Sequence, residues 1–241
     1  MRQKILGAAL GVAVLAAGSR AGAYEVITVT DGGSLSGTVK YAGTPPEVPK
    51  IEVTKDSEVC GTEKVDPKLI IGSGGAIQEV AVVVKAAKGK ALTVPTEPIT
   101  FDQKGCAYVP HVLAFPAGST LAVLNSDGIL HNVHTLPKVN KAFNQAMPGT
   151  RKEATTQFDK EEAIFHTKCD VHPWMSAYVG VFNHPFFSVT STDGKFTISG
   201  LDPGTYEITA WHEVLGPQTA SITVGANDKK VQDFKFALPA K

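Results

Sequence analysis

After residue 24 the chain alternates apolar and polar side chains over short runs, and glycine, proline, aspartate or asparagine separates one run from the next. A period of two places successive side chains on opposite faces of an extended strand, so this pattern predicts strands with one buried face. A short segment around residues 160–162 is the one stretch where we expect a helix. The sequence therefore predicts a nearly all-β protein. The expected strands span residues 24–30, 36–41, 79–85, 111–115, 120–125, 131–135, 163–167, 177–182, 187–191, 195–199, 205–212 and 219–224.

The first 23 residues follow a different pattern. Arg2 and Lys4 precede an apolar run from residue 5 to about 17, and the segment closes on Ala21-Gly22-Ala23, a small-x-small cleavage signal. The run is shorter than the roughly 20 residues that a membrane-spanning helix needs. We interpret residues 1–23 as a secretory signal peptide. The mature protein is then expected in the periplasm or outside the cell, with no membrane span after cleavage.

The charge of the mature chain disfavours nucleic acid as a partner. Removal of Arg2, Lys4 and Arg20 leaves 20 basic and 23 acidic residues, a formal charge of −3. The chain has no run of lysine and arginine that could neutralise a series of phosphates. Nucleic acid is therefore not expected as a partner.

The C-terminal part carries hairpin and turn signals. Asp193-Gly194 lies between two expected strands, and Pro203-Gly204 precedes the next one. This region resembles the carboxypeptidase regulatory-like, transthyretin-like sandwich. The usual opening of that family, a G-x-V strand followed by a valine-rich strand, is matched far upstream by residues 37–39 and 80–84. The resemblance implies an immunoglobulin- or transthyretin-like sandwich that is interrupted by another domain.

Two domain arrangements fit this reading. In the first, residues 24–98 and 184–241 form the regulatory-like sandwich and residues 99–183 are inserted between its second and third strands. Chain termini of a domain often lie close together, which makes such an insertion possible. In the second, two domains follow one another, and residues 24–91 supply extra strands to the first.

The mature chain has three cysteines, an odd number for an exported protein. Cys60 and Cys106 lie in loop-like contexts, where an oxidising compartment favours a disulfide between them. Cys169 is then left without a disulfide partner. An unpaired thiol is at risk of oxidation unless a metal or deep burial protects it. We therefore interpret Cys169 as a functional residue of a chemical site.

Cys169, His172 and Met175 lie within seven residues, in a loop between two expected strands. A thiolate, two imidazoles and a weak axial thioether form the ligand set that selects copper and supports electron transfer. The second imidazole must come from elsewhere, and His131 and His134 offer it at a loop-to-strand junction. Because they are three residues apart on a strand, they point to opposite faces and one of them is expected to bind.

The HNVH and C-x-x-H-P-aromatic-M motifs resemble the plastocyanin and amicyanin family of cupredoxins, over roughly residues 99–183. The resemblance implies a Greek-key β-sandwich, with Asn132 tying the ligand loops together by hydrogen bonds. It also implies that His172 is partly exposed as the port for electrons, within an apolar surface patch of Pro173 and Trp174 that Met147-Pro148 could extend. It further implies one type 1 (blue) copper ion per chain, with the ligands His131, Cys169, His172 and Met175.

The expected function is that of a one-electron carrier between a redox protein donor and acceptor, without catalysis. A copper-delivery protein is an alternative, although Met147 and Met175 are the only methionines of the mature chain. A carbohydrate-binding or adhesion module with an accessory copper domain is another, with Phe186, Phe187 and Trp211 either exposed or in the core.

The remaining histidines are expected to have structural roles. His134 is expected to point away from the metal, and whether His111 or His134 takes part in the site stays open. His166, His184 and His212 are expected to cap or hydrogen-bond locally.

Overall fold

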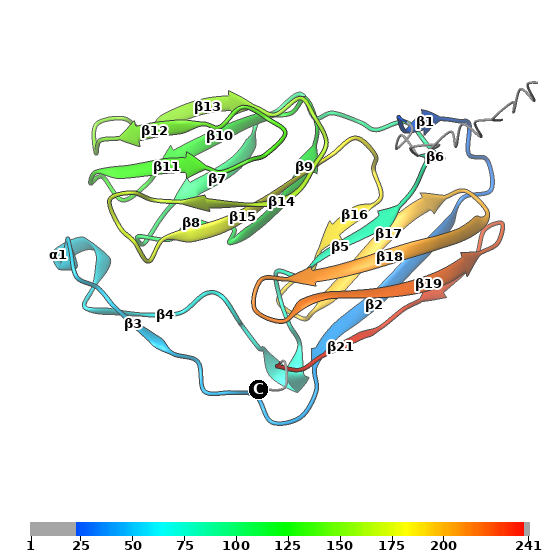
Figure 1. The fold of residues 1–241 in the computed structure, drawn as a ribbon, viewed down its shortest axis with the longest axis horizontal. Coiled ribbons are helices and arrows are strands. Elements are labelled where there is room, and N and C mark those ends of the chain that lie inside the picture. Colours follow the sequence, from blue (N-terminus) through cyan, green and yellow to red (C-terminus); the bar gives the residue numbers. More distant parts are fainter. Residues whose placement is uncertain (1–22, 239–241) are drawn as a thin grey trace, which may run out of the picture.

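The computed structural model describes residues 23–238, so the predicted signal peptide lies outside the described residues except for Ala23. The regular structure of residues 23–238 is almost entirely β, which confirms the all-β prediction. Figure 1 shows two β-sandwiches side by side, with an arm that leaves one of them and runs to the other. Within the described range, no helix has the length and apolar character needed to cross a membrane.

The central sandwich is built from residues 99–182. Its strands are β7 (Ile99–Gln103), β8 (Tyr108–Val109), β9 (Val112–Pro116), β10 (Thr120–Asn125), β11 (His131–Thr135), β12 (Asn144–Met147), β13 (Glu153–Gln157), β14 (Glu162–Lys168) and β15 (Ser176–Phe182). One sheet has the order β13-β10-β7-β8 and the other β12-β11-β14-β15-β9. The β7/β10 and β9/β15 pairs are parallel. Phe101, Phe115 and Phe158 are fully buried between the sheets, where alternate side chains of each strand meet.

The flanking sandwich takes strands from both sides of the central one in sequence. Its strands are β2 (Gly33–Tyr41), β5 (Ala81–Lys85), β16 (Phe187–Val189), β17 (Lys195–Leu201), β18 (Gly204–His212), β19 (Gly216–Val224), β20 (Lys229–Val231) and β21 (Phe234–Phe236). The sheet orders are β16-β5-β18-β19 and β17-β2-β20, and β21 also pairs with β2. Strands that precede and follow the central sandwich thus share both sheets. The domain boundaries at 24–98, 99–183 and 184–241 stay predictions.

The arm comprises residues 50–65, between β2 and β5. It contains β3 (Lys50–Glu52), α1 (Ser57–Cys60) and β4 (Glu63–Val65), with β3 and β4 paired as an antiparallel hairpin. Cys60 at the end of α1 forms a disulfide with Cys106 of the central sandwich, which confirms the predicted pairing. Val53 and Cys60 are buried in the central core. The arm is therefore anchored to the central sandwich although it belongs in sequence to the flanking one.

The minor elements are β1 (Glu25–Val26), which pairs in parallel with β6 (Lys88–Gly89), and the short 3-10 turn η1 (Ser73–Gly75). The helix expected around residues 160–162 is absent: Glu162 begins β14. Its buried carboxylate accepts the N–H groups of Val139 and Asn140, so it anchors a neighbouring loop instead. Those hydrogen bonds also hold the pKa of Glu162 below its ordinary value, against the opposing effect of burial.

Candidate metal centre

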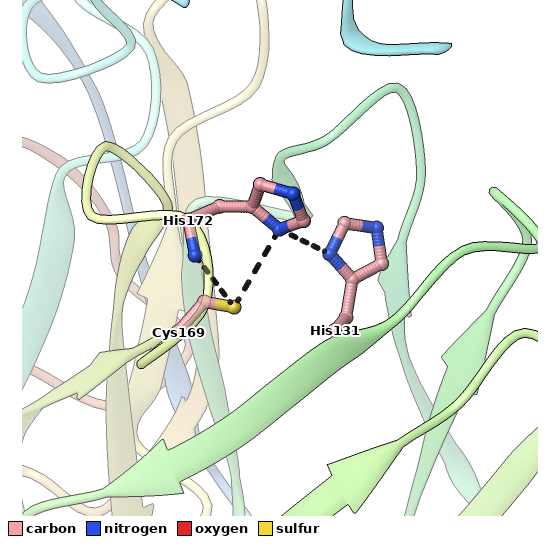
Figure 2. A group of neighbouring side chains, drawn as sticks. All are labelled: His131, Cys169 and His172. Atoms are coloured by element: carbon pink, nitrogen blue, oxygen red, sulfur yellow. Dashed lines mark hydrogen bonds between the residues drawn. The ribbon is translucent and has the colours of Figure 1, made fainter. Parts of the chain in front are cut away.

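Three of the four predicted ligands meet at one end of the central sandwich (Figure 2). His131 is the first residue of β11, and Cys169 and His172 lie in the loop between β14 and β15. Their ligand atoms lie within 4.8 Å of one another. Nδ1 of His172 is 2.9 Å from Nδ1 of His131 and 3.9 Å from Sγ of Cys169. Both imidazoles are fully buried, and Cys169 is 3% exposed.

The far edge of each imidazole faces a carboxylate. Nε2 of His131 lies 2.9 Å from Oδ2 of Asp127, and Nε2 of His172 lies 2.8 Å from Oδ2 of Asp56. A carboxylate only accepts hydrogen bonds, so both Nε2 atoms carry the proton. In its neutral form each imidazole has one such proton, so both Nδ1 atoms direct lone pairs at each other. A metal cation bound between them would accept both lone pairs.

Burial lowers the pKa of His131, and this effect outweighs the raising effect of its hydrogen bond to Asp127. A lowered pKa favours the neutral imidazole, which is the form that binds metals. The electrostatics of this residue therefore agree with the tautomer that its hydrogen bond requires.

Two backbone N–H groups point at the sulfur of Cys169. The N–H of Asn132 lies 3.3 Å from Sγ and that of His172 lies 3.4 Å away. These two donors hold the sulfur in place on the side that faces the imidazoles. The thiolate is the form in which cysteine binds a metal.

The spacing of the donor atoms suits one ion. Nitrogen and sulfur ligands bind at about 2.0–2.3 Å, so donors around a single ion lie roughly 3.3–3.8 Å apart. The Nδ1–Nδ1 separation of 2.9 Å is slightly shorter than that range, and the Sγ–Nδ1 separation of 3.9 Å is slightly longer. Small side-chain shifts would therefore bring His131, Cys169 and His172 to one metal ion. Sγ of Cys106 also lies near Asp127 and His131, but it is part of the disulfide and offers no thiolate.

Met175 closes the ligand loop. Its N–H donates to the carbonyl of His172 at 2.9 Å, and its carbonyl accepts the N–H of Cys169 at 3.1 Å. The side chain is 1% exposed and packs in the central core. These contacts hold the loop in a tight turn. The assignment of Met175 as an axial ligand stays a prediction.

Asn132 ties the ligand segments together, as the resemblance implies. Its Nδ2 donates to Oδ1 of Asn144 at 2.8 Å, and its Oδ1 accepts the N–H of Asp170 at 3.2 Å. One side chain thus links β11 to β12 and to the loop that carries Cys169. This prediction is confirmed.

The other histidines lie outside the three-donor group. His134 pairs with Asp170 at 2.8 Å, and His111 pairs with Glu213. His184 and His212 accept backbone N–H groups two or three residues further along the chain, so their predicted local hydrogen bonds are confirmed.

The positions of His131 and His134 predict which of the two binds the metal. In copper-loaded protein, His134→Gln is expected to leave the visible spectrum unchanged, because the His134 imidazole is held by Asp170. The matched variant His131→Gln is expected to abolish the spectrum of a thiolate-bound copper. Loss of the band in His134→Gln with its survival in His131→Gln would contradict the assignment. Absorption spectra of the two variants at equal copper loading make the comparison.

The expectation that His172 is partly exposed is wrong. Its side chain is fully buried because the arm places Asp56 against its outer edge. Trp174 packs on the imidazole with ring centroids 5.1 Å apart, and its indole N–H donates to the carbonyl of Cys106. Met147 is also fully buried and belongs to the core instead of a surface patch.

Sequence reasoning missed both carboxylates. Asp127 could have been found, because it lies four residues before His131 in the loop that leads into β11. Asp56 lies 116 residues before His172, and no sequence pattern connects the two.

Part of the chain resembles a known family in sequence. Residues 173–237 match the family model of the carboxypeptidase regulatory-like domain. The resemblance to the regulatory-like family is thus confirmed over the matched residues, and the strands of the structure confirm the all-β fold class. No curated protein matches the chain.

Several solved structures are similar in fold. A copper-containing nitrite reductase from Thermus scotoductus SA-01 is 20% identical, with 41% of this chain and 26% of that chain covered and a TM-score of 0.35. This chain thus spans about a quarter of that reductase. An oxidised mutant of amicyanin is 22% identical, with 42% and 98% covered and a TM-score of 0.33. A purple cupredoxin from Nitrosopumilus maritimus is 23% identical, with 34% and 98% covered and a TM-score of 0.30. Likenesses of this size carry no argument on function.

Proposed function

We propose that the mature protein is an exported type 1 copper protein that carries single electrons between a protein donor and a protein acceptor. The observation that carries the proposal is the convergence of two imidazole lone pairs and a thiol sulfur within 4.8 Å in a buried site. His131, Cys169 and His172 would be the strong ligands and Met175 the weak axial one, a set that suits copper. The copper ion, when bound, would supply the one-electron redox change.

The residues around the centre would limit the structural rearrangement that accompanies the redox change of the copper ion. The carboxylates of Asp127 and Asp56 hold the two imidazoles, and two N–H groups hold the sulfur of Cys169. Outer hydrogen bonds of this kind fix ligand orientation and tune the metal. A site whose ligands are fixed before the metal changes charge needs little rearrangement, which is the requirement for fast electron transfer. We propose no substrate chemistry.

Burial of the site disfavours the copper-delivery alternative. Exchange of a copper ion with a partner requires access to the ligands, whereas both imidazoles are fully buried. The adhesion alternative is disfavoured because its three candidate aromatic side chains pack against other residues. Phe186 is buried in the flanking core, Phe187 stacks on Phe182 and Trp211 packs on Tyr178.

We place the protein in the periplasm or outside the cell. The Cys60–Cys106 disulfide supports this location, because disulfides persist in oxidising compartments. The predicted signal peptide points to the same location.

The test is the visible and EPR spectrum of the Cu(II)-loaded mature protein and of Cys169→Ser. Cys169 is the free cysteine of the described residues, so the substitution removes the thiolate and leaves the disulfide intact. We expect an intense band near ~600 nm with narrow copper hyperfine splitting, lost in the variant. A wild type without the band, or a band that survives the substitution, would refute the proposed centre. A reversible one-electron couple in voltammetry is expected for a carrier, and an irreversible response would refute that role.

A further inference from the structure

The outer edge of His172 is covered by a residue from outside the central sandwich. Asp56 lies in the arm, between β3 and α1, and Oδ2 of its carboxylate is 2.8 Å from Nε2 of His172. The Asp56 side chain is 29% exposed, while the His172 imidazole is fully buried. Asp56 thus stands between the imidazole and the solvent.

The backbone and the disulfide together fix the position of Asp56. Asp56 adopts the left-handed conformation, with φ 52° and ψ 40°, and its carbonyl accepts the N–H groups of Val59 and Cys60. Few residues other than glycine, asparagine and aspartate adopt this conformation readily. Cys60, four residues further on, is then bound covalently to Cys106.

The Cys106 end of the disulfide is also tied to the centre. The N–H groups of Gly105 and Cys106 donate to the carboxylate of Asp127 at 2.5 and 2.7 Å, and that carboxylate holds His131. The carbonyl of Cys106 accepts the indole N–H of Trp174, which packs on His172. The disulfide therefore links the arm that carries Asp56 to the turn that hydrogen-bonds Asp127.

We propose that Asp56 is a positioning residue for the copper ligand His172, supplied by the disulfide-tethered arm, and that its charge favours Cu(II) over Cu(I). This inference rests on the proposed function. The carboxylate keeps the proton on Nε2, so the Nδ1 lone pair faces the metal. Its negative charge, on the far side of the imidazole, stabilises the more highly charged ion more strongly. The reduction potential of the centre is thereby lowered.

The decisive variant is Asp56→Asn. Asparagine tolerates the left-handed backbone and its amide oxygen still accepts the Nε2 proton, so the change removes the charge alone. We expect the blue band to persist, with the affinity for Cu(II) about tenfold weaker and the affinity for Cu(I) much less affected. If the affinity for Cu(II) falls tenfold more than the affinity for Cu(I), the reduction potential of the centre rises by about 59 mV for a one-electron couple. Asp56→Glu keeps the charge and is expected to stay nearer to the wild-type potential.

The matched control is Glu58→Gln. Glu58 is exposed in α1 of the same arm, so this variant also removes one negative charge from the arm but leaves the contact with His172 intact. Its potential and copper affinities are expected to equal those of the wild type. An equal rise in Glu58→Gln and Asp56→Asn would assign the effect to the overall charge of the arm and overturn the proposal.

A measurement on metal-free protein tests the positioning separately. Imidazole ¹⁵N spectra are expected to show His172 in the Nε2–H tautomer in the wild type, and a tautomer mixture in Asp56→Gly, which lacks the acceptor. A wild type without a thiolate–copper band would refute the proposed function. A normal wild-type centre, with an unchanged potential in Asp56→Asn and an unchanged tautomer in Asp56→Gly, would overturn this inference alone.

Discussion

Replacing both Cys60 and Cys106 with alanine is expected to lower the free energy of unfolding by about 4 kcal/mol. The two cysteines are 46 residues apart in sequence. A cross-link over such a loop restricts the unfolded chain, and the loss of entropy in the unfolded state stabilises the folded one. The closed loop contains β4, β5 and β7, so it couples the arm, the flanking sandwich and the central sandwich. Denaturant unfolding of the metal-free protein measures the change.

The control for this prediction is Cys169→Ala in the same metal-free background. Cys169 is buried like Cys60 and Cys106, so this variant reports the cost of removing a buried sulfur without opening a loop. We expect its effect to be clearly smaller than that of the double variant. If the double variant lost no more stability than Cys169→Ala, the disulfide would not stabilise the fold through its loop.

The flanking sandwich also holds the edge of the central one. The carboxylate of Glu79 accepts the N–H groups of His111 and Val112 at the start of β9, and Glu213 pairs with the His111 imidazole. Tyr178 of β15 packs on Trp211 of β18, with ring centroids 5.0 Å apart. These contacts and the disulfide attach the two sandwiches at separate places. The arm can therefore hold Asp56 at a fixed position over the centre.

The features that sequence could predict are local ones. The alternation of apolar and polar residues identified most strands, because one face of each is buried within its own sandwich. The loop from Cys169 to Met175 was recognisable because its three candidate ligands lie within seven residues. The 2-residue strand β1 was expected to be longer, but its partner β6 offers only two residues for pairing. The helix α1 has four residues, too few to show a helical period.

The features that sequence could not predict depend on contacts between distant segments. The exposure of His172 was inferred from a resemblance to small single-domain carriers, and that resemblance covers about residues 99–183 only. The arm that buries His172 lies outside that region. A backbone turn and a disulfide bring Asp56 to the imidazole, and neither leaves a pattern that relates residue 56 to residue 172.

Acidification is expected to destabilise the fold between pH 6.5 and pH 4 through two buried histidines away from the centre. Burial lowers the pKa of His184 and that of His212 from 6.5 to about 4. Nδ1 of His184 accepts the N–H of Phe186, and Nδ1 of His212 accepts those of Val214 and Leu215. Protonation of either imidazole would therefore remove an acceptor that the backbone uses.

The direction of the effect follows from the two pKa values of each group. Below pH 6.5 the unfolded chain binds protons at both histidines, while the folded protein does so only near pH 4. The stabilising contribution is thus fully present above pH 6.5 and is lost as the pH falls to about 4. One pKa unit corresponds to about 1.4 kcal/mol, so each histidine contributes about 2 kcal/mol after allowance for solvent screening. At His212, Glu213 raises the pKa and His111 lowers it, each by less than burial does. Glu161 also faces His184, at 3.7 Å from its Nε2.

The measurement is the free energy of unfolding of metal-free protein at several pH values from 7 to 4, for the wild type, His184→Gln and His212→Gln. The difference between wild type and variant cancels the titration of all other groups, which both proteins share. Each variant is expected to lose about 2 kcal/mol less than the wild type across this range. Ile208→Val, a fully buried substitution on the same strand as His212, is the control and is expected to lower stability equally at every pH. If the histidine variants kept the wild-type pH dependence, these two imidazoles would not be responsible for the acid sensitivity of the fold.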